Sequence, residues 1–392
     1  MRSHSRYVRW AAPAAGVAAV AAVTVSSLIS AASAAPVLPL VTPGQLLAAV
    51  AGQKTPPPPL TGTVVETASL GLPDLPGIGN QNTMTSLLTG SHTVKVWYGG
   101  PRQVRLAVPV PLGETDLIRN GTAAYLWQSS SNTVTRYLLP AHAGQAGQPA
   151  PTPSPTGTPL TPQQAAQRAL AVAGRSTVVS VDSNVSVAGQ AAYQLVLAPR
   201  DSRSLVGRVT IALDGQHPQV PLRVQVFARR AATPAFQVGY TSISFVTPAA
   251  ANFTFTPPSG ATVHTVTPQP PSGMTHGTGP APSALGAQVI GRNWLSVAVL
   301  PATALPGLTG AGSAAAAAGQ AARSISGGGG SGPSGGAVLA ALLKAATPVH
   351  GAWGSGRLLR TGLLSVLITD SGHVLAGAVT PSVLYAAAGQ VK

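Results

Sequence analysis

The chain has 392 residues, in which 23 Lys and Arg outnumber 8 Asp and Glu, and it contains no cysteine. The length suits one large domain and a smaller one. Without cysteine, disulfides, thiolate metal sites, thiol catalysis and lipid attachment to a cysteine are excluded. The formal charge of +15 favours anionic neighbours such as phospholipid head groups, although a scattered positive excess also serves simply to keep a protein in solution.

The N-terminus has the order of a secretory signal. Arg2, Arg6 and Arg9 precede an uncharged run over 11–28, and an A-x-A cleavage site follows at 32–34. We therefore predict that residues 1–34 form a signal peptide. The run is also long enough for an uncleaved membrane anchor, which is the alternative. In either case the remaining chain is expected outside the cytoplasm, secreted or attached to the outer face of the cytoplasmic membrane.

A first group of short strands is predicted between residues 61 and 138, because apolar and polar residues alternate there with period two. The glycines and proline of 99–101 and the Asn120-Gly121 pair are typical of the turns that join antiparallel strands. The expected strands cover 61–69, 94–98, 104–108, 117–119, 125–127 and 134–138. Such spacing indicates an antiparallel meander.

Two short helices are predicted to pack on this sheet. Thr42-Pro43 precedes the run 44–51, and Thr161-Pro162 precedes 163–173, so each helix has Thr as N-cap and Pro at its first position. Before the second helix, residues 141–159 form a Pro, Gly, Ala and Thr tract without periodicity. We predict that this tract is a disordered insertion on the surface.

Period-two alternation resumes after the second helix, with strands expected at 178–181, 185–187, 193–197, 209–213, 222–227 and 236–245. Residues 267–288 are rich in Pro, Gly, Ser and Thr and are predicted to be a linker. A small C-terminal domain is expected over 289–392, interrupted by a low-complexity insertion at 307–337 that cannot bury enough apolar area to order itself. It contains a predicted hairpin over 363–379 and a helix at 381–388.

A curved, half-open sheet with helices over one side can leave an apolar cavity, which is a common form of small-molecule site. The candidate lining residues are the larger apolar side chains of one strand face: Val96, Tyr98, Leu106, Val108, Leu195, Leu197, Val224 and Val226. Alternation indicates which residues are buried and not whether they enclose a void. Plain packing of sheet on helix is therefore the competing interpretation.

The stretch 71–90 between the first two strands is too long for a hairpin loop. It carries six large apolar residues among glycine and proline: Leu72, Leu75, Ile78, Met84, Leu87 and Leu88. A mobile apolar flap at the mouth of a cavity would have this composition. An ordinary long loop would have it too, and both interpretations stay open.

The serial order of the strand motifs resembles a known superfamily. The block 192–245 contains YQLVL, VTIALD, PLRVQVF and FQVGYTSISF in that order, followed by PPSGATV, and VWYGGPRQVRLAV, ETDLIRNGTAAYLW and TVTRYLLP come before it. This order resembles the LolA-like superfamily of lipoprotein carriers, and within it the branch of the periplasmic sigma-factor regulators RseB and MucB. The resemblance covers about residues 46–266, and the corresponding half-barrel domain is expected over 35–266.

The resemblance implies a mainly β (α+β) fold: an open half-barrel antiparallel sheet with helices on its concave face, followed by a small C-terminal α+β segment. It also implies binding of an acyl chain, lipid or lipoprotein segment in the cavity of a cell-envelope protein, as carrier or sensor. In the regulator branch the domain shields a membrane-bound anti-sigma factor. The alternative function is therefore a regulatory protein that binds such a membrane partner in envelope-stress signalling.

The sequence does not predict an enzyme. Glu114 and Asp116 are two residues apart at the start of a strand, without a neighbouring histidine, and are expected to be exposed turn carboxylates. The histidines do not form a metal-binding array, so neither a metal nor a cofactor is predicted. A nucleic-acid partner is not expected, because the arginines are dispersed and the chain is predicted to be exported. The expected partners are an apolar ligand, a membrane surface and the regulatory protein just named.

Overall fold

The structure, a computed structural model, describes residues 38–51, 56–70, 89–110, 113–139, 159–267, 287–302 and 345–391. The predicted signal peptide, the low-complexity insertion 307–337 and nearly all of the insertion 141–159 lie outside the described residues. So do the six predicted flap residues, Leu72, Leu75, Ile78, Met84, Leu87 and Leu88. Within the described ranges, no helix has both the length and the apolar character needed to cross a bilayer.

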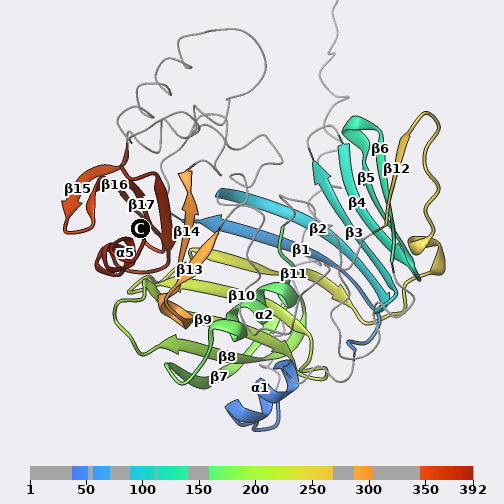
Figure 1. The fold of residues 1–392 in the computed structure, drawn as a ribbon. Helices are drawn as coiled ribbons and strands as arrows, with labels where there is room; N and C mark the ends of the chain where they lie inside the picture. Colours follow the sequence, from blue (N-terminus) through green and yellow to red (C-terminus); the bar gives the residue numbers. More distant parts are fainter. Residues whose placement is uncertain are drawn as a thin grey trace, which may run out of the picture.

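One large sheet dominates the fold, as the alternation predicts (Figure 1). It has twelve strands in the order β12-β6-β5-β4-β3-β2-β1-β11-β10-β9-β8-β7 and does not close into a barrel. The strands are β1 Leu60–Ser69, β2 Thr89–Gly100, β3 Gln103–Val110, β4 Gly113–Asn120, β5 Ala123–Gln128, β6 Thr133–Leu138, β7 Thr177–Val187, β8 Gln190–Pro199, β9 Val206–Asp214, β10 Pro221–Ala228, β11 Phe236–Ser244 and β12 Thr262–Val266. The mainly β prediction is confirmed.

The two runs of strands meet at a central seam between β1 and β11, where Val64 lies opposite Tyr240. Local hairpins build each half, and the Asn120-Gly121 turn between β4 and β5 is one of them. Gly121 has φ +63 there, a conformation that glycine adopts without the strain a side chain would add. The seam is therefore the contact that joins the N-terminal and C-terminal halves of the sheet.

The outermost pair departs from the expected antiparallel pattern, because β12 runs parallel to β6 with Val263 beside Val134. After β11 the chain crosses the sheet as a segment over 245–261, which we call the strap. Phe253 of the strap is buried against Gly99, and Phe255 contacts the rings of Tyr125 and Trp127. The strap carries the chain to the far edge of the sheet before β12 begins. Strand β12 therefore pairs with β6 while running in the same direction.

Helix α2, Pro162–Val172, lies in the concavity of the sheet against β10 and β11 (Figure 1). Thr161 caps it as predicted: its hydroxyl accepts from the Gln164 N–H at 3.3 Å, and the Gln164 side chain accepts from the Thr161 N–H at 3.0 Å. Ala165 and Ala166 bring the helix close to Val224 and Val238 in the main core. Helix α1, Pro43–Ala51, contacts α2 and β7 and contributes Leu46 and Val50 to the same core.

The C-terminal unit is a second sheet with the order β13-β14-β18-β17-β16-β15. Its strands are β13 Gln288–Ile290, β14 Val297–Pro301, β15 Thr347–Gly351, β16 Gly354–Arg360, β17 Ser365–Thr369 and β18 His373–Gly377. Helix α5, Pro381–Ala388, lies against β17 and β18, and its Leu384 is buried with Leu367 and Leu375. This small α+β unit agrees with the predicted fold class.

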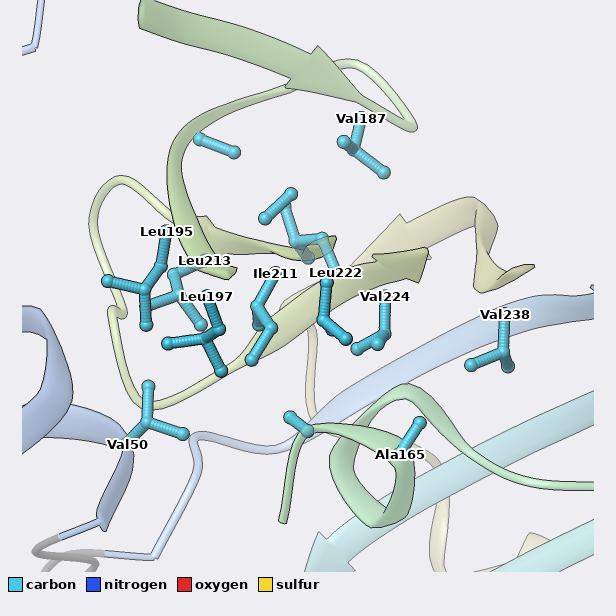
Figure 2. Close-up of a cluster of buried hydrophobic side chains, with 14 of the residues drawn as sticks. Val50, Ala165, Val187, Leu195, Leu197, Ile211, Leu213, Leu222, Val224 and Val238 are labelled. Atoms are coloured by element: carbon cyan, nitrogen blue, oxygen red, sulfur yellow. The ribbon is translucent and has the colours of Figure 1, made fainter. Parts of the chain in front are cut away.

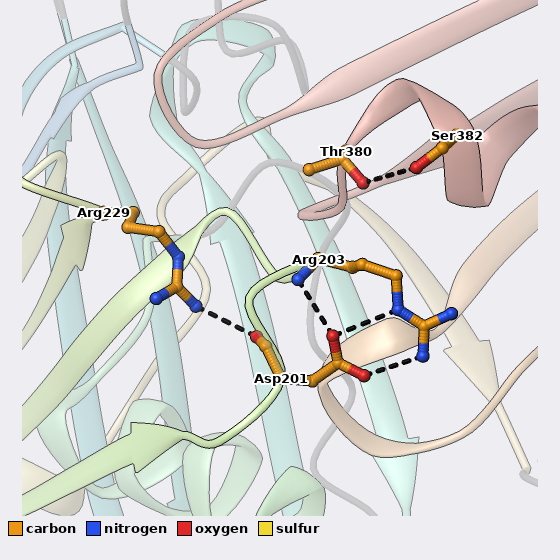
Figure 3. A network of polar contacts seen from close by, with 5 residues as sticks. All are labelled: Asp201, Arg203, Arg229, Thr380 and Ser382. Carbon is orange, nitrogen blue, oxygen red and sulfur yellow. Dashed lines mark hydrogen bonds and ion pairs between the residues drawn. The ribbon is translucent and has the colours of Figure 1, made fainter.

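The two sheets are joined by backbone as well as side-chain contacts. The Leu205 N–H donates to the Ala378 carbonyl and the Thr380 N–H donates to the Arg203 carbonyl, both at 2.8 Å. Figure 3 shows the turn that presents this edge: the Asp201 carboxylate accepts from the Arg203 guanidinium at 2.7 Å, and Arg229 donates to the Asp201 carbonyl at 2.9 Å. The pKa of Asp201 is lowered to about 2, first by its side-chain hydrogen bond with Arg203.

Candidate ligand-binding face

The predicted cavity residues all belong to one face of the large sheet, which we call the concave face because α2 lies against it. Strand register establishes this, since residues directly opposite one another point to the same side. Val96 is opposite Leu106 across β2 and β3. On the other half, Val224 is opposite Ile211, which is opposite Leu195, and Val226 is linked through Val209 to Leu197.

Burial divides the eight residues into two groups. Val96, Leu195, Leu197 and Val224 are buried within a cluster of well-packed aliphatic side chains. Figure 2 shows Leu195, Leu197 and Val224 in this cluster, which Val50 and Ala165 join from the two helices. On the half of the face that the helices cover, the side chains therefore pack against one another as a core.

The second group, Tyr98, Leu106, Val108 and Val226, is half-buried and packs against the margin of the same core. Tyr98, Leu106 and Val108 lie together on β2 and β3. Burial raises the pKa of Tyr98 to about 12. This part of the face combines apolar surface with partial access, as a ligand site requires.

Three further apolar residues extend this half-buried surface and were not among the candidates: Phe236, Tyr240 and Ile243 of β11. Register places Tyr240 opposite Val64 on the concave face. Burial raises the pKa of Tyr240 as well. The β11 strand was recognised from the sequence, but a bulge between Thr63 and Val64 shifts the pairing of β1 with β11, and alternation alone does not reveal such a shift.

Glu66 is a buried acid on the concave face that sequence reasoning missed. It occupies an inward position of β1 and accepts a hydrogen bond from the Leu160 N–H at 2.5 Å. Burial raises the pKa of Glu66, while the Leu160 hydrogen bond and the charges of His92 and Arg168 act in the opposite direction. Because Leu160 directly precedes the N-cap of α2, Glu66 fixes the start of the helix to the middle of the sheet.

The opposite face carries a second acid that corrects an expectation. Asp116 is not an exposed turn carboxylate: it lies inside β4, is 1% exposed and accepts from the Arg105 guanidinium at 2.5 Å. Glu114 is 3.9 Å from the same guanidinium, and Trp97 lies beneath it at 5.3 Å. Burial raises the pKa of Asp116 to about 6 despite the contact with Arg105. The expectation was wrong because β4 already begins at Gly113, so Asp116 lies within the strand and is covered by its neighbours.

The described ranges contain no group of three His, Asp or Glu side chains placed to hold a metal ion. Glu66 anchors a helix, Asp116 and Asp201 each pair with an arginine, and Asp214 accepts from the backbone N–H groups of Gln216 and His217. These contacts are structural.

No family model and no curated protein matches the chain. Among solved structures, MucB of Pseudomonas aeruginosa in its complex with MucA is similar at 14% identity and TM-score 0.39, over 88% of this chain and 96% of that one. A LolA-superfamily protein of Nitrosomonas europaea is similar at 12% identity and TM-score 0.21, over 55% and 99%. These are the two groups of proteins that the sequence resembles.

An uncharacterised conserved protein of Thermus thermophilus is also similar, at 11% identity and TM-score 0.31, over 57% of this chain and 98% of that one. All three likenesses are distant in sequence and partial in shape.

Proposed function

We propose that this protein binds an apolar chain-like ligand, such as an acyl chain or a lipoprotein segment, on its concave face outside the cytoplasm. The supporting observation is the gradient of burial across that face. A sealed core under α2 continues without interruption into the half-buried patch of Tyr98, Leu106 and Val108. A ligand laid on this patch extends the existing core instead of having to open it.

The driving force is removal of apolar surface from water, worth about 25 cal/mol per Å² before the cost of ordering the ligand is subtracted. An extended acyl chain suits a strip of aliphatic and aromatic side chains, because such contacts require no directional partner. Leu195, Leu197, Val96 and Val224 then act as the rigid floor that holds the patch in place, and Tyr98, Leu106, Val108 and Val226 are the proposed contacts.

A titration with a fluorescent long-chain fatty acid tests the proposal. Leu106→Asn places an amide in the patch and should weaken binding about tenfold or more, since burying an unpaired amide costs about 1–3 kcal/mol. Val178→Asn is the matched control, because Val178 is 42% exposed on the edge strand β7. Equal weakening in both variants, or no saturable binding by the unchanged protein, contradicts the proposal. Thermal unfolding of each variant separates loss of binding from loss of fold.

Export is part of the proposal and rests on the order of charged, apolar and small residues in 1–34. Expression in a secreting host followed by N-terminal sequencing of the product tests it. A mature chain that begins after Ala34 supports a cleaved signal, and an intact N-terminus recovered with membranes supports the anchor instead. Recovery of the intact chain from the cytoplasm contradicts both.

The alternative, a regulatory protein with a membrane-bound protein partner, rests on the sequence resemblance. Crosslinking distinguishes this alternative from the ligand proposal, because only the alternative predicts a protein partner. A protein that crosslinks reproducibly to the native chain and competes with the fatty acid would assign the concave face to that partner.

A further inference from the structure

Strand β12 forms an outer edge of the large sheet. It is the last strand in the sheet order, and within the described part of the chain it pairs only with β6. All five of its residues, Thr262–Val266, are exposed. The Thr262 N–H donates to the Asn132 carbonyl at 3.0 Å, on the side of β6. Because backbone groups alternate in direction along a strand, the N–H and C=O groups of Val263 and Thr265 point away from β6.

The other outer strands of the two described sheets each have a feature that hinders pairing with a further strand. Strand β7 has a bulge between Asp182 and Val185. Strand β15 contains Pro348, which has no N–H to donate, and β13 has only three residues. Strand β12 keeps an unbroken register and contains no proline, lysine, arginine or carboxylate. It is therefore the outer strand best suited to accept another strand.

Exposed apolar side chains gather at this edge. Of the seven large apolar residues that are exposed within the described ranges, three lie on β6 and β12: Leu138, Val263 and Val266. Val263 is 48% exposed and Val266 is 41% exposed. Their odd spacing places them on opposite faces of the sheet. A strand added beside β12 would cover apolar surface on both faces.

The charge of the edge favours a second copy of this chain over a charged peptide. The whole chain has a formal charge of +15, so two copies can approach closely only where basic side chains are absent. The basic residue next to β12 is Arg136 of β6, opposite Thr265. Its guanidinium group lies 6.0 Å from the centre of the Tyr125 ring on β5, away from the edge. The edge is thus open to an uncharged strand such as β12 itself.

We infer that β12 pairs antiparallel with β12 of a second copy, around a two-fold axis at His264. The outward backbone groups of Val263 in one copy then meet those of Thr265 in the other, and each such pair exchanges two hydrogen bonds. The same residues face each other from both sides, so the assembly closes as a dimer and does not continue into a fibre. Five residues a side make a small interface, and a weak dimer is expected. The inference is independent of the proposed ligand on the concave face.

Thiol crosslinking of the purified full chain tests the register. The chain has no cysteine of its own, so one introduced thiol reports only its own contacts. His264→Cys should form a disulfide-linked dimer on mild oxidation, because directly facing residues of a non-hydrogen-bonded pair have Cα atoms about 4.5 Å apart. Thr262→Cys is the matched control on the same face of the same strand, where the register separates the two copies of residue 262 by about 13 Å. Equal crosslinking of both variants overturns the inference.

Sedimentation of the unchanged chain over a range of concentrations tests the dimer itself. Thr265→Pro removes an outward N–H and keeps the side of β12 that faces β6. Two-fold symmetry removes two hydrogen bonds at once, so the Kd of the dimer should rise about tenfold or more. Thr265→Ala keeps the N–H and should change the Kd less, and thermal unfolding of both variants checks the fold. A chain that stays monomeric leaves the edge to a different partner, and a dimer unaffected by Thr265→Pro has its interface elsewhere; either result overturns the inference.

Discussion

Trp294 of the C-terminal unit donates a hydrogen bond from its indole Nε1 to the hydroxyl of Thr177, at the start of β7, over 2.7 Å. Both side chains are buried, and Trp294 belongs to the core of the large sheet. The C-terminal unit thus inserts an aromatic anchor into the larger one, in addition to the backbone bridge at Ser204 and Val379. We therefore expect the two units to unfold together.

Trp294→Phe should lower the free energy of unfolding by about 1–2 kcal/mol, because it keeps most of the packing and removes the donor to Thr177. Trp294→Ala should cost about 3–5 kcal/mol through the cavity it leaves. Denaturant unfolding of Trp294→Phe, Thr177→Val and the double variant measures the coupling between the two residues. Additive effects within about 0.3 kcal/mol would show that the hydrogen bond contributes nothing.

Glu66→Ala should release the start of α2 by removing the acceptor of the Leu160 N–H, at a cost of about 1–3 kcal/mol. Glu66→Gln keeps an oxygen at that position and should retain most of the stability at neutral pH, because it also removes a buried charge. Hydrogen exchange of the Leu160 amide gives the local readout. Equal protection of that amide in the Ala and Gln variants argues against the anchoring role.

Asp116 should make the protein less stable as the pH rises from about 4 to 6. Its pKa is raised by burial from 3.8 to about 6 in the folded chain, so within this window the folded state holds a proton that the unfolded state has released. The contribution of Asp116 to the free energy of unfolding is favourable below that window and is lost as the pH rises through it. The raised pKa of Glu66 changes the stability in the same direction. Urea unfolding at several pH values should show the slope, and Asp116→Asn should flatten it. If the slope is unchanged in that variant, groups other than Asp116 cause the pH dependence of stability.

Phe253→Ala should loosen the strap and destabilise the protein by about 3–5 kcal/mol, because this ring is buried against Gly99 and the neighbouring strands. Phe255→Ala is the comparison, since Phe255 is only half-buried and should cost less. Faster hydrogen exchange in β12 is expected in Phe253→Ala, because the strap delivers that strand to the edge of the sheet. If exchange in β12 is unchanged, the strand holds its place without the strap.

Most of the large sheet could be predicted from local patterns. Alternation, the Asn120-Gly121 turn and the Thr161-Pro162 cap each depend on residues close together in the chain, and each is found in the structure. The hairpin of β17 and β18 and the helix after Thr380 follow in the same way. These features are local because a turn or a cap fixes only a few backbone angles.

What alternation could not supply were the contacts between distant segments. The parallel pairing of β12 with β6 depends on where the strap crosses, and the strap itself has no periodic pattern. In the sequence, Glu66 is one polar residue within a strand. Its hydrogen bond with the Leu160 N–H joins residues that are 94 positions apart, so local patterns do not predict it. For the candidate site, the shared face of Val96 and Val224 was predictable from period two, whereas the enclosure of Leu195 and Leu197 by the helices was not.

The seam between β1 and β11 has a consequence for how this chain is made. At this seam Thr241 donates its hydroxyl proton to the Thr63 carbonyl across 178 residues of sequence. Each half-sheet has neighbours to fold against as soon as it is synthesised, but the seam must wait for β11, and contacts so remote in sequence form slowly. Until then β1 and β10 each present an unpaired strand edge, and such edges can pair with other copies of the chain.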